Sequence, residues 1–151
     1  MAVTIRIQTE SFDAAAETAA LTGGRADIGA VVAFTGLCRD EGGKLAALEL
    51  EHYPGMAEAE IARIAAQAES RWPLLGLTII HRYGLIRPAQ EIVLVLAASA
   101  HRRPAFEAAE FLMDYLKTRA PFWKREHLKD GTIGSWVEAK DADDRALARW
   151  L

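Results

Sequence analysis

The chain has 151 residues, of which 51% are hydrophobic and 26% charged, and its formal net charge at pH 7 is −3. This length predicts a single domain over residues 1–151 with a substantial apolar core. A pI near 5.8 argues against general nucleic-acid binding, which relies on excess cations. No apolar run is long enough to span a bilayer. The lone Cys38 excludes an internal disulfide and indicates a reducing, cytoplasmic compartment.

Alternating apolar residues, helical periodicity and turn residues predict the following elements in chain order. They are a strand at 3–7, a helix at 12–21, strands at 29–36 and 45–52, a helix at 56–71, strands at 77–83 and 91–98, a helix at 104–119, extended segments at 122–127 and 135–137, and a helix at 141–150. Ser11 is the expected N-cap of the first helix. After a turn at 40–43, we expect the strand 45–52 to return beside 29–36. This order predicts an α+β fold with helices over one mainly antiparallel sheet.

The most informative segment is 117–126, where four cations and one acid surround a Pro-Phe-Trp sequence. Basic residues gathered in an acidic chain usually meet an anion. Lys117 ends a helix on which Phe106, Ala109, Met113 and Leu116 are expected to form the apolar face, and it lies close to the angle of Phe106. Two interpretations follow. Its stem could lie along the edge of the core with the ammonium in water, which position alone favours, or burial could lower its pKa and make it a nucleophile or general acid-base group.

Lys124 follows seven residues later, beyond Pro121. In an extended strand it shares one face with Phe122 and Glu126, while Trp123 and Arg125 occupy the other. A sharp corner at 120–121 would bring Lys124 back beside Lys117, and two neighbouring ammonium groups attract phosphate. The alternative is a solvated strand with one Glu–Lys pair.

A second candidate anion site is the strand-to-helix turn at 99–104, with His101, Arg102 and Arg103. Free backbone N–H groups at a helix start favour anions, although an ordinary charged loop is an equal alternative. Arg39 follows a strand end and could line a pocket. Cys38 beside it is expected to fill apolar space rather than to react. The four histidines lack the paired spacing of a zinc site.

These residues carry a resemblance over 29–150. The segments 33–36 with Arg39, 50–56, 99–102 and above all 113–126 resemble the large, catalytic subunits of molybdopterin synthases, the MoaE family. The resemblance implies an α/β-hammerhead fold with a small antiparallel subdomain. It implies a homodimer in which each copy binds one small ubiquitin-like subunit, giving a heterotetramer. The thiocarboxylated Gly-Gly end of that subunit would donate sulfur to a cyclic pyranopterin monophosphate precursor, forming the molybdopterin dithiolene without metal or ATP.

The resemblance also implies roles for particular residues. Lys117 and Lys124 match catalytic positions. The residues that match substrate-pocket positions are Leu37, Cys38, Arg39, His101, Arg102, Arg125 and Glu126, together with the two lysines. Leu37 and Cys38 depart from the pattern, which has a basic and an aliphatic residue there, so one substrate contact is expected to be weaker. Two rival functions remain open: a non-catalytic module that docks a ubiquitin-like tail, and a sensor of phosphate-bearing ligands.

Overall fold

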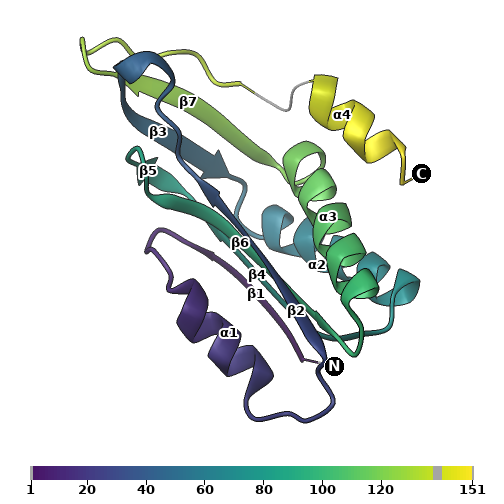
Figure 1. The fold of residues 1–151 in the computed structure, drawn as a ribbon. Helices are drawn as coiled ribbons and strands as arrows, with labels where there is room; N and C mark the ends of the chain where they lie inside the picture. The colour runs from purple at the N-terminus through teal and green to yellow at the C-terminus, as the bar shows by residue number, and fades with distance from the viewer. Residues whose placement is uncertain (1, 138–140, 151) are drawn as a thin grey trace.

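A computed structural model describes residues 2–137 and 141–150, with the side chains of 141–144 left out. The elements are β1 Ala2–Gln8, α1 Ala14–Thr22, β2 Ala30–Leu37, a 3-10 turn Glu41–Gly43, β3 Leu45–His52, α2 Met56–Arg71, β4 Leu74–Arg82, β5 Gly84–Ile86, β6 Glu91–Ser99, α3 Arg102–Thr118, β7 Phe122–Leu128 and α4 Asp141–Ala148 (Figure 1). No helix within these ranges is long and apolar enough to cross a membrane.

The strands form two sheets, which confirms the α+β class but not the expected single sheet. The larger has the order β1-β4-β6-β2 and the smaller β5-β3-β7. All pairs are antiparallel except β1 with β4. The prediction that residues 45–52 return beside β2 is wrong. β2 pairs with β6, whereas β3 pairs with β5 and β7 in the smaller sheet. The smaller sheet is the small antiparallel unit that the resemblance implied.

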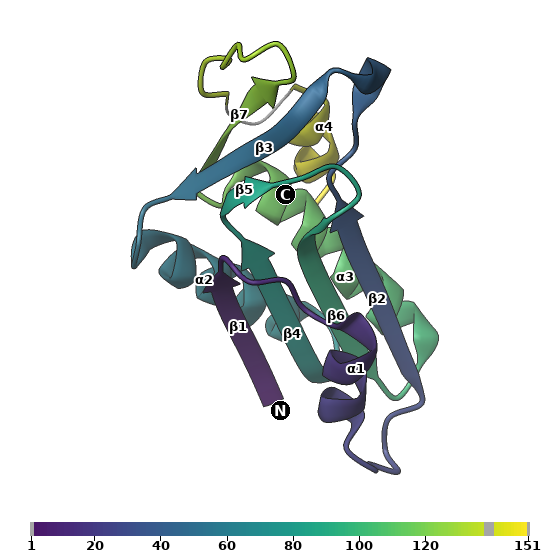
Figure 2. The same ribbon diagram turned by 90° about the vertical axis from the view of Figure 1, so that its left-hand side faces the viewer.

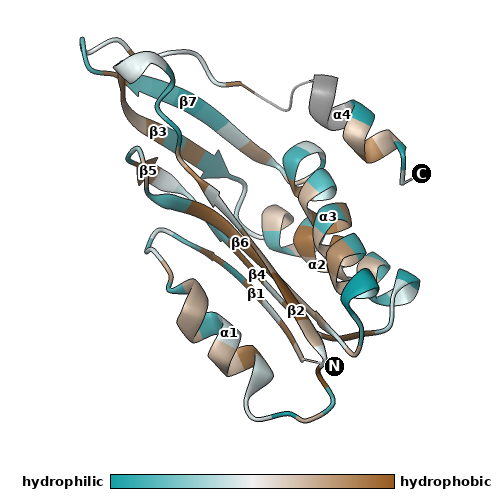
Figure 3. Ribbon diagram, viewed as in Figure 1, coloured by the Kyte–Doolittle hydropathy of each residue, from teal (hydrophilic) through white to brown (hydrophobic). Residues whose placement is uncertain are grey.

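Helices cover both faces of the larger sheet. α1 lies on one face, and α2 and α3 lie side by side on the other (Figures 1 and 2). Alternation along β4 divides the core accordingly: Leu77 and Ile79 pack with α2 and α3, and Ile80 packs on the side of Leu21 from α1. Both faces of the central strands are therefore apolar, and Figure 3 shows β6 largely in brown.

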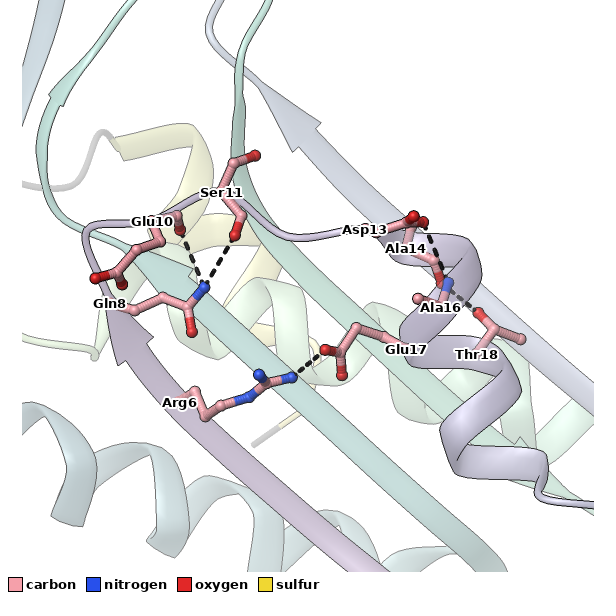
Figure 4. Close-up of polar contacts among 9 residues, drawn as sticks. All are labelled: Arg6, Gln8, Glu10, Ser11, Asp13, Ala14, Ala16, Glu17 and Thr18. Carbon is pink, nitrogen blue, oxygen red and sulfur yellow. Dashed lines mark hydrogen bonds and ion pairs between the residues drawn. The ribbon is translucent and has the colours of Figure 1, made fainter.

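The cap of α1 differs from the prediction by two residues. Asp13, not Ser11, is the N-cap, and its Oδ1 accepts a hydrogen bond of 3.1 Å from the backbone N–H of Ala16 (Figure 4). The Ser11 hydroxyl instead donates to Glu91 on β6. A carboxylate at the cap also suits the positive end of the helix. Figure 4 shows Glu17, in the first turn, reaching Arg6 on β1, which ties the helix to the edge strand.

The two long helices, α2 and α3, each bury one face against the larger sheet, and this packing positions the site. On α2, Ile61, Ile64, Ala65 and Ala68 are buried as predicted, but Met56 is 61% exposed. On α3 the predicted apolar face is wrong at its first position. Phe106 is 61% exposed, and the buried positions are Ala105, Ala108, Ala109, Phe111, Leu112, Tyr115 and Leu116.

Candidate functional site

A cleft of about 1040 Å³ lies where the C-terminal end of α3 meets the two sheets. Its walls come from segments far apart in the sequence: the end of β2 with the following loop, β3, the last turn of α3, β7 and residues 134–137. The last of these walls is tied to β7, because the backbones of Val137 and Lys124 exchange two hydrogen bonds.

Lys117 and Lys124 both line this cleft. The convergence depends on the corner at 119–121, after which β7 runs back along β3. Lys124 stands directly opposite the buried Leu50 of β3, so its side chain leaves the strand on the inner face, and it is half-buried. Lys117 is exposed. This exposure argues against the interpretation of a desolvated Lys117 and favours the alternative, in which the lysine lies at the edge of the core.

The cleft is strongly cationic. Of the residues that the structure describes, five cationic side chains border it against two carboxylates, in a chain whose net charge is −3. The cations are Arg39, Lys117, Arg119, Lys124 and Arg125, and the acids are Glu41 and Glu126. Such an excess of one charge in a concave site attracts anions. Among the described residues, no three His, Cys, Asp or Glu side chains gather closely enough to hold a metal ion.

Three consecutive residues at the end of β2 line the cleft but differ in their exposure to solvent. Leu37 is exposed, and Arg39 is exposed and paired with the Glu41 carboxylate. Cys38 is buried with Leu45, Leu50 and Ile86, and burial raises the pKa of its thiol. A thiol held protonated is a poor nucleophile. Cys38 therefore serves as an apolar wall residue.

Arg125 and Glu126 border the same cleft but leave β7 on opposite faces. Arg125 pairs with Glu49 of β3 on the outer face, where its guanidinium lies 4.3 Å from the centre of the Trp136 ring. Glu126 is on the same face as Lys124 and is exposed. The alternation predicted from the sequence is thus present. It separates Arg125 from the two lysines.

His101 and Arg102 do not reach this cleft within one chain. They lie at the start of α3 and line a separate hollow of about 440 Å³ together with Arg103, Phe106 and Glu107. Arg102 and Lys117 are fifteen residues apart on one helix, which corresponds to roughly 22 Å along its axis. His101 is the N-cap residue of α3, but its side chain makes no capping hydrogen bond.

His81, a buried residue at the end of β4, also lines the cleft, although the sequence did not predict a role for it there. Its Nδ1 lies 2.8 Å from the Arg82 carbonyl oxygen, and its ring stacks on Phe122 with centroids 3.8 Å apart. Burial above all, together with the nearby Lys117 and His52, lowers its pKa to about 4. The sequence places His81 on a buried strand, but nothing local indicates that this strand ends beneath α3.

Comparisons with known proteins agree with this architecture. A profile described as MoaE protein matches residues 7–119. The molybdopterin synthase catalytic subunit of Mesorhizobium japonicum is 71% identical over 150 residues, which are 99% of this chain and 94% of that protein. The structure of the molybdopterin biosynthesis MoaE protein from Burkholderia ambifaria matches with a TM-score of 0.85 at 52% identity, covering 99% of this chain and 98% of that one. A molybdopterin synthase structure from Staphylococcus aureus matches with a TM-score of 0.78 at 31% identity, covering 87% of this chain and 94% of that one. Because the profile spans most of the chain and relatives of high identity cover nearly all of it, the chain belongs to the MoaE family.

Proposed function

We propose that this chain is the catalytic subunit of a molybdopterin synthase. It is a sulfurtransferase that moves sulfur from the thiocarboxylated C-terminus of a small ubiquitin-like subunit to a cyclic pyranopterin monophosphate, forming the dithiolene. The observation that carries the proposal is the meeting of Lys117 and Lys124 in one cation-rich cleft. A thiocarboxylate tail and a phosphate-bearing substrate are both anions, and both are attracted to such a site.

In the proposed mechanism the two lysines have different tasks. Lys124 comes from the inner face of β7 and adds positive charge as the phosphate oxygen leaves the precursor. Lys117 is exposed at the end of α3 and acts as general acid-base, or as a transient covalent partner, while the sulfur attacks. Arg39 holds substrate at the wall opposite, after release from Glu41. Glu41 and Arg39 are both exposed, so this exchange costs little.

We further propose that the enzyme is a homodimer whose copies share each site. His101 and Arg102 match substrate-pocket positions, yet they lie at the far end of α3 from Lys117. An arginine side chain cannot bridge roughly 22 Å along a helix. A second copy related by two-fold symmetry can place the start of its α3 against the first copy's cleft. With one small subunit on each copy, the assembly is a heterotetramer.

Reconstitution tests the proposed activity. The full chain is incubated with the thiocarboxylated small subunit and the precursor, and dithiolene formation is measured together with conversion of the tail to a carboxylate by mass spectrometry. Sulfur transfer supports the proposal. A complex that forms without moving sulfur identifies a docking module instead.

The hollow at His101 and Arg102 supports a second candidate function, a sensor of phosphate-bearing ligands, because it combines cations with a helix N-terminus. Calorimetry with inorganic phosphate on the free chain addresses it. Tight binding that Arg102→Ala removes, in a chain without sulfur-transfer activity, supports a sensor.

A further inference from the structure

His81 is a titratable side chain on the floor of the cleft that the proposed mechanism does not use. It stands at the end of β4, only 8% exposed, and lines the cleft together with Lys117. Buried polar groups need partners, so the state of each ring nitrogen decides what His81 can do.

One nitrogen is already engaged. Nδ1 lies 2.8 Å from the Arg82 carbonyl oxygen. A carbonyl only accepts hydrogen bonds, so Nδ1 carries the hydrogen and donates it. Burial, which lowers the pKa of His81 to about 4, keeps the ring neutral at pH 7. In a neutral ring with hydrogen on Nδ1, Nε2 carries a lone pair and can only accept.

The lone pair opens to the cleft. Among the described residues, His52 Nδ1 is the one buried side-chain nitrogen or oxygen without a hydrogen-bond partner. Nε2 of His81, which the described residues give no partner, is therefore not sealed in the core. Since His81 borders the cleft, that is where Nε2 is accessible.

The ring is also fixed in place. It stacks on Phe122 at 3.8 Å with an interplanar angle of 17°, and the same Phe122 ring stacks with His52 at 5.8 Å. Phe122 is the first residue of β7, directly after the corner that joins the two lysine-bearing segments. Nε2 thus has a fixed direction relative to both α3 and β7.

We propose that His81 is a positioning residue for Lys117, whose ammonium donates a hydrogen bond from Nζ to His81 Nε2. An exposed lysine samples many rotamers, and ordering it costs side-chain entropy. A neutral acceptor on the cleft floor selects the rotamers that point into the cleft. The two side chains line the same cleft, so they can approach each other there. This inference rests on the proposed role of Lys117.

Two substitutions separate the acceptor from the ring. His81→Phe keeps the stack on Phe122 but removes both nitrogens. His81→Gln loses the ring and keeps an amide oxygen near the position of Nε2. We expect His81→Phe to lower kcat by about 10- to 100-fold with KM little changed, and His81→Gln to recover most of that loss. His52→Phe, at the other histidine that contacts Phe122, is the matched control and should retain kcat.

A second measurement does not depend on turnover. The nitrogen-15 chemical shift of His81 Nε2 is compared between the full chain and its Lys117→Met variant, which keeps the length of the stem. A hydrogen bond from Lys117 predicts a clear change in this shift. An unchanged shift, wild-type kcat in His81→Phe, or equal losses in the Phe and Gln variants each overturn the inference. Turnover retained in Lys117→Ala contradicts the proposed role of Lys117 instead, while the chemical shift still reports on the hydrogen bond.

Discussion

Glu49 and Arg125 stand directly opposite each other on β3 and β7, with Arg125 Nε 2.7 Å from Glu49 Oε1. The same oxygen lies 2.8 Å from His127 Nε2. One carboxylate thus ties two residues of β7 to the middle strand of the smaller sheet, and Trp136 closes over the guanidinium. The arrangement holds β7 in a register that directs Lys124 to the inner face.

Replacing Glu49 by Gln removes the charge but keeps the shape. We expect the free energy of unfolding at pH 7 to fall by about 1 kcal/mol, a modest value because the pair is partly exposed. Hydrogen bonds from His127 and then Arg125 lower the pKa of Glu49. Its contribution is therefore present above pH 4.5 and is lost as the pH falls through the lower folded-state pKa. Urea unfolding of both proteins from pH 7 to pH 3 should show the difference in free energy of unfolding becoming smaller. A constant difference would contradict a stabilising role for the Glu49 charge.

Lys117→Ala should reduce sulfur transfer by at least about 10²-fold, since a positioned acid-base group contributes that much or more. Because Lys117 is exposed, urea unfolding should be nearly unchanged. Lys129→Ala is the matched control, as Lys129 is exposed at the end of β7 outside the cleft wall. Equal activity of the two variants would remove Lys117 from the mechanism.

Mixing two inactive variants tests whether copies share a site. In a dimer of Lys117→Ala with Arg102→Ala, one of the two sites has Lys117 and Arg102 both intact only if they come from different copies. Random mixing makes half of the dimers mixed, so about a quarter of wild-type activity should return after subunit exchange. Sites made within one copy predict no recovery.

His81 should make the fold sensitive to acid. Its folded-state pKa of about 4 lies below the ordinary 6.5, because the charged form is buried. The unfolded chain takes up a proton as the pH falls below 6.5, whereas the folded chain resists until about pH 4. Up to about 3 kcal/mol of stability is therefore present above pH 6.5 and lost across this window. The positive charge of Lys117 from α3 also opposes protonation, and His52 from β3 adds to this effect when it is protonated. Wild type should lose stability more steeply than His81→Phe between pH 6.5 and 4, and parallel curves would contradict this.

Trp150 anchors the C-terminal segment to α3. Its ring packs edge-on against Trp72 and Phe111, and its Nε1 donates to Asp114 Oδ2, which Arg149 also contacts at 2.9 Å. Trp150→Ala should lower the free energy of unfolding by about 2–3 kcal/mol, below the cost for a fully buried Trp because the ring is half-exposed. Arg145→Ala, at an exposed position on α4, is the control. Equal stability of the two variants would show that the segment is not docked.

Local chemistry by itself determined much of this protein. The bounds of β3 and α2 were predicted to the residue, because alternation, helical periodicity and the Pro73 stop act within a few residues. The basic segment 117–126 indicated an anion site, because its four cations lie close together in the sequence itself. The predicted helix at 104–119 also implied a separation between Lys117 near its end and His101 in the turn before its start.

Tertiary structure decided the rest. Whether residues 45–52 joined β2 or a second sheet depended on β7, which lies at least seventy residues further along the chain, because strand pairing is non-local. The exposure of Lys117 depended on how far the core extends under the last turn of α3. The role inferred for His81 depended on Phe122 arriving from another sheet to fix its ring. Such contacts between distant segments leave no local pattern in the chain, and they set which side chains of a charged segment face one another across the cleft.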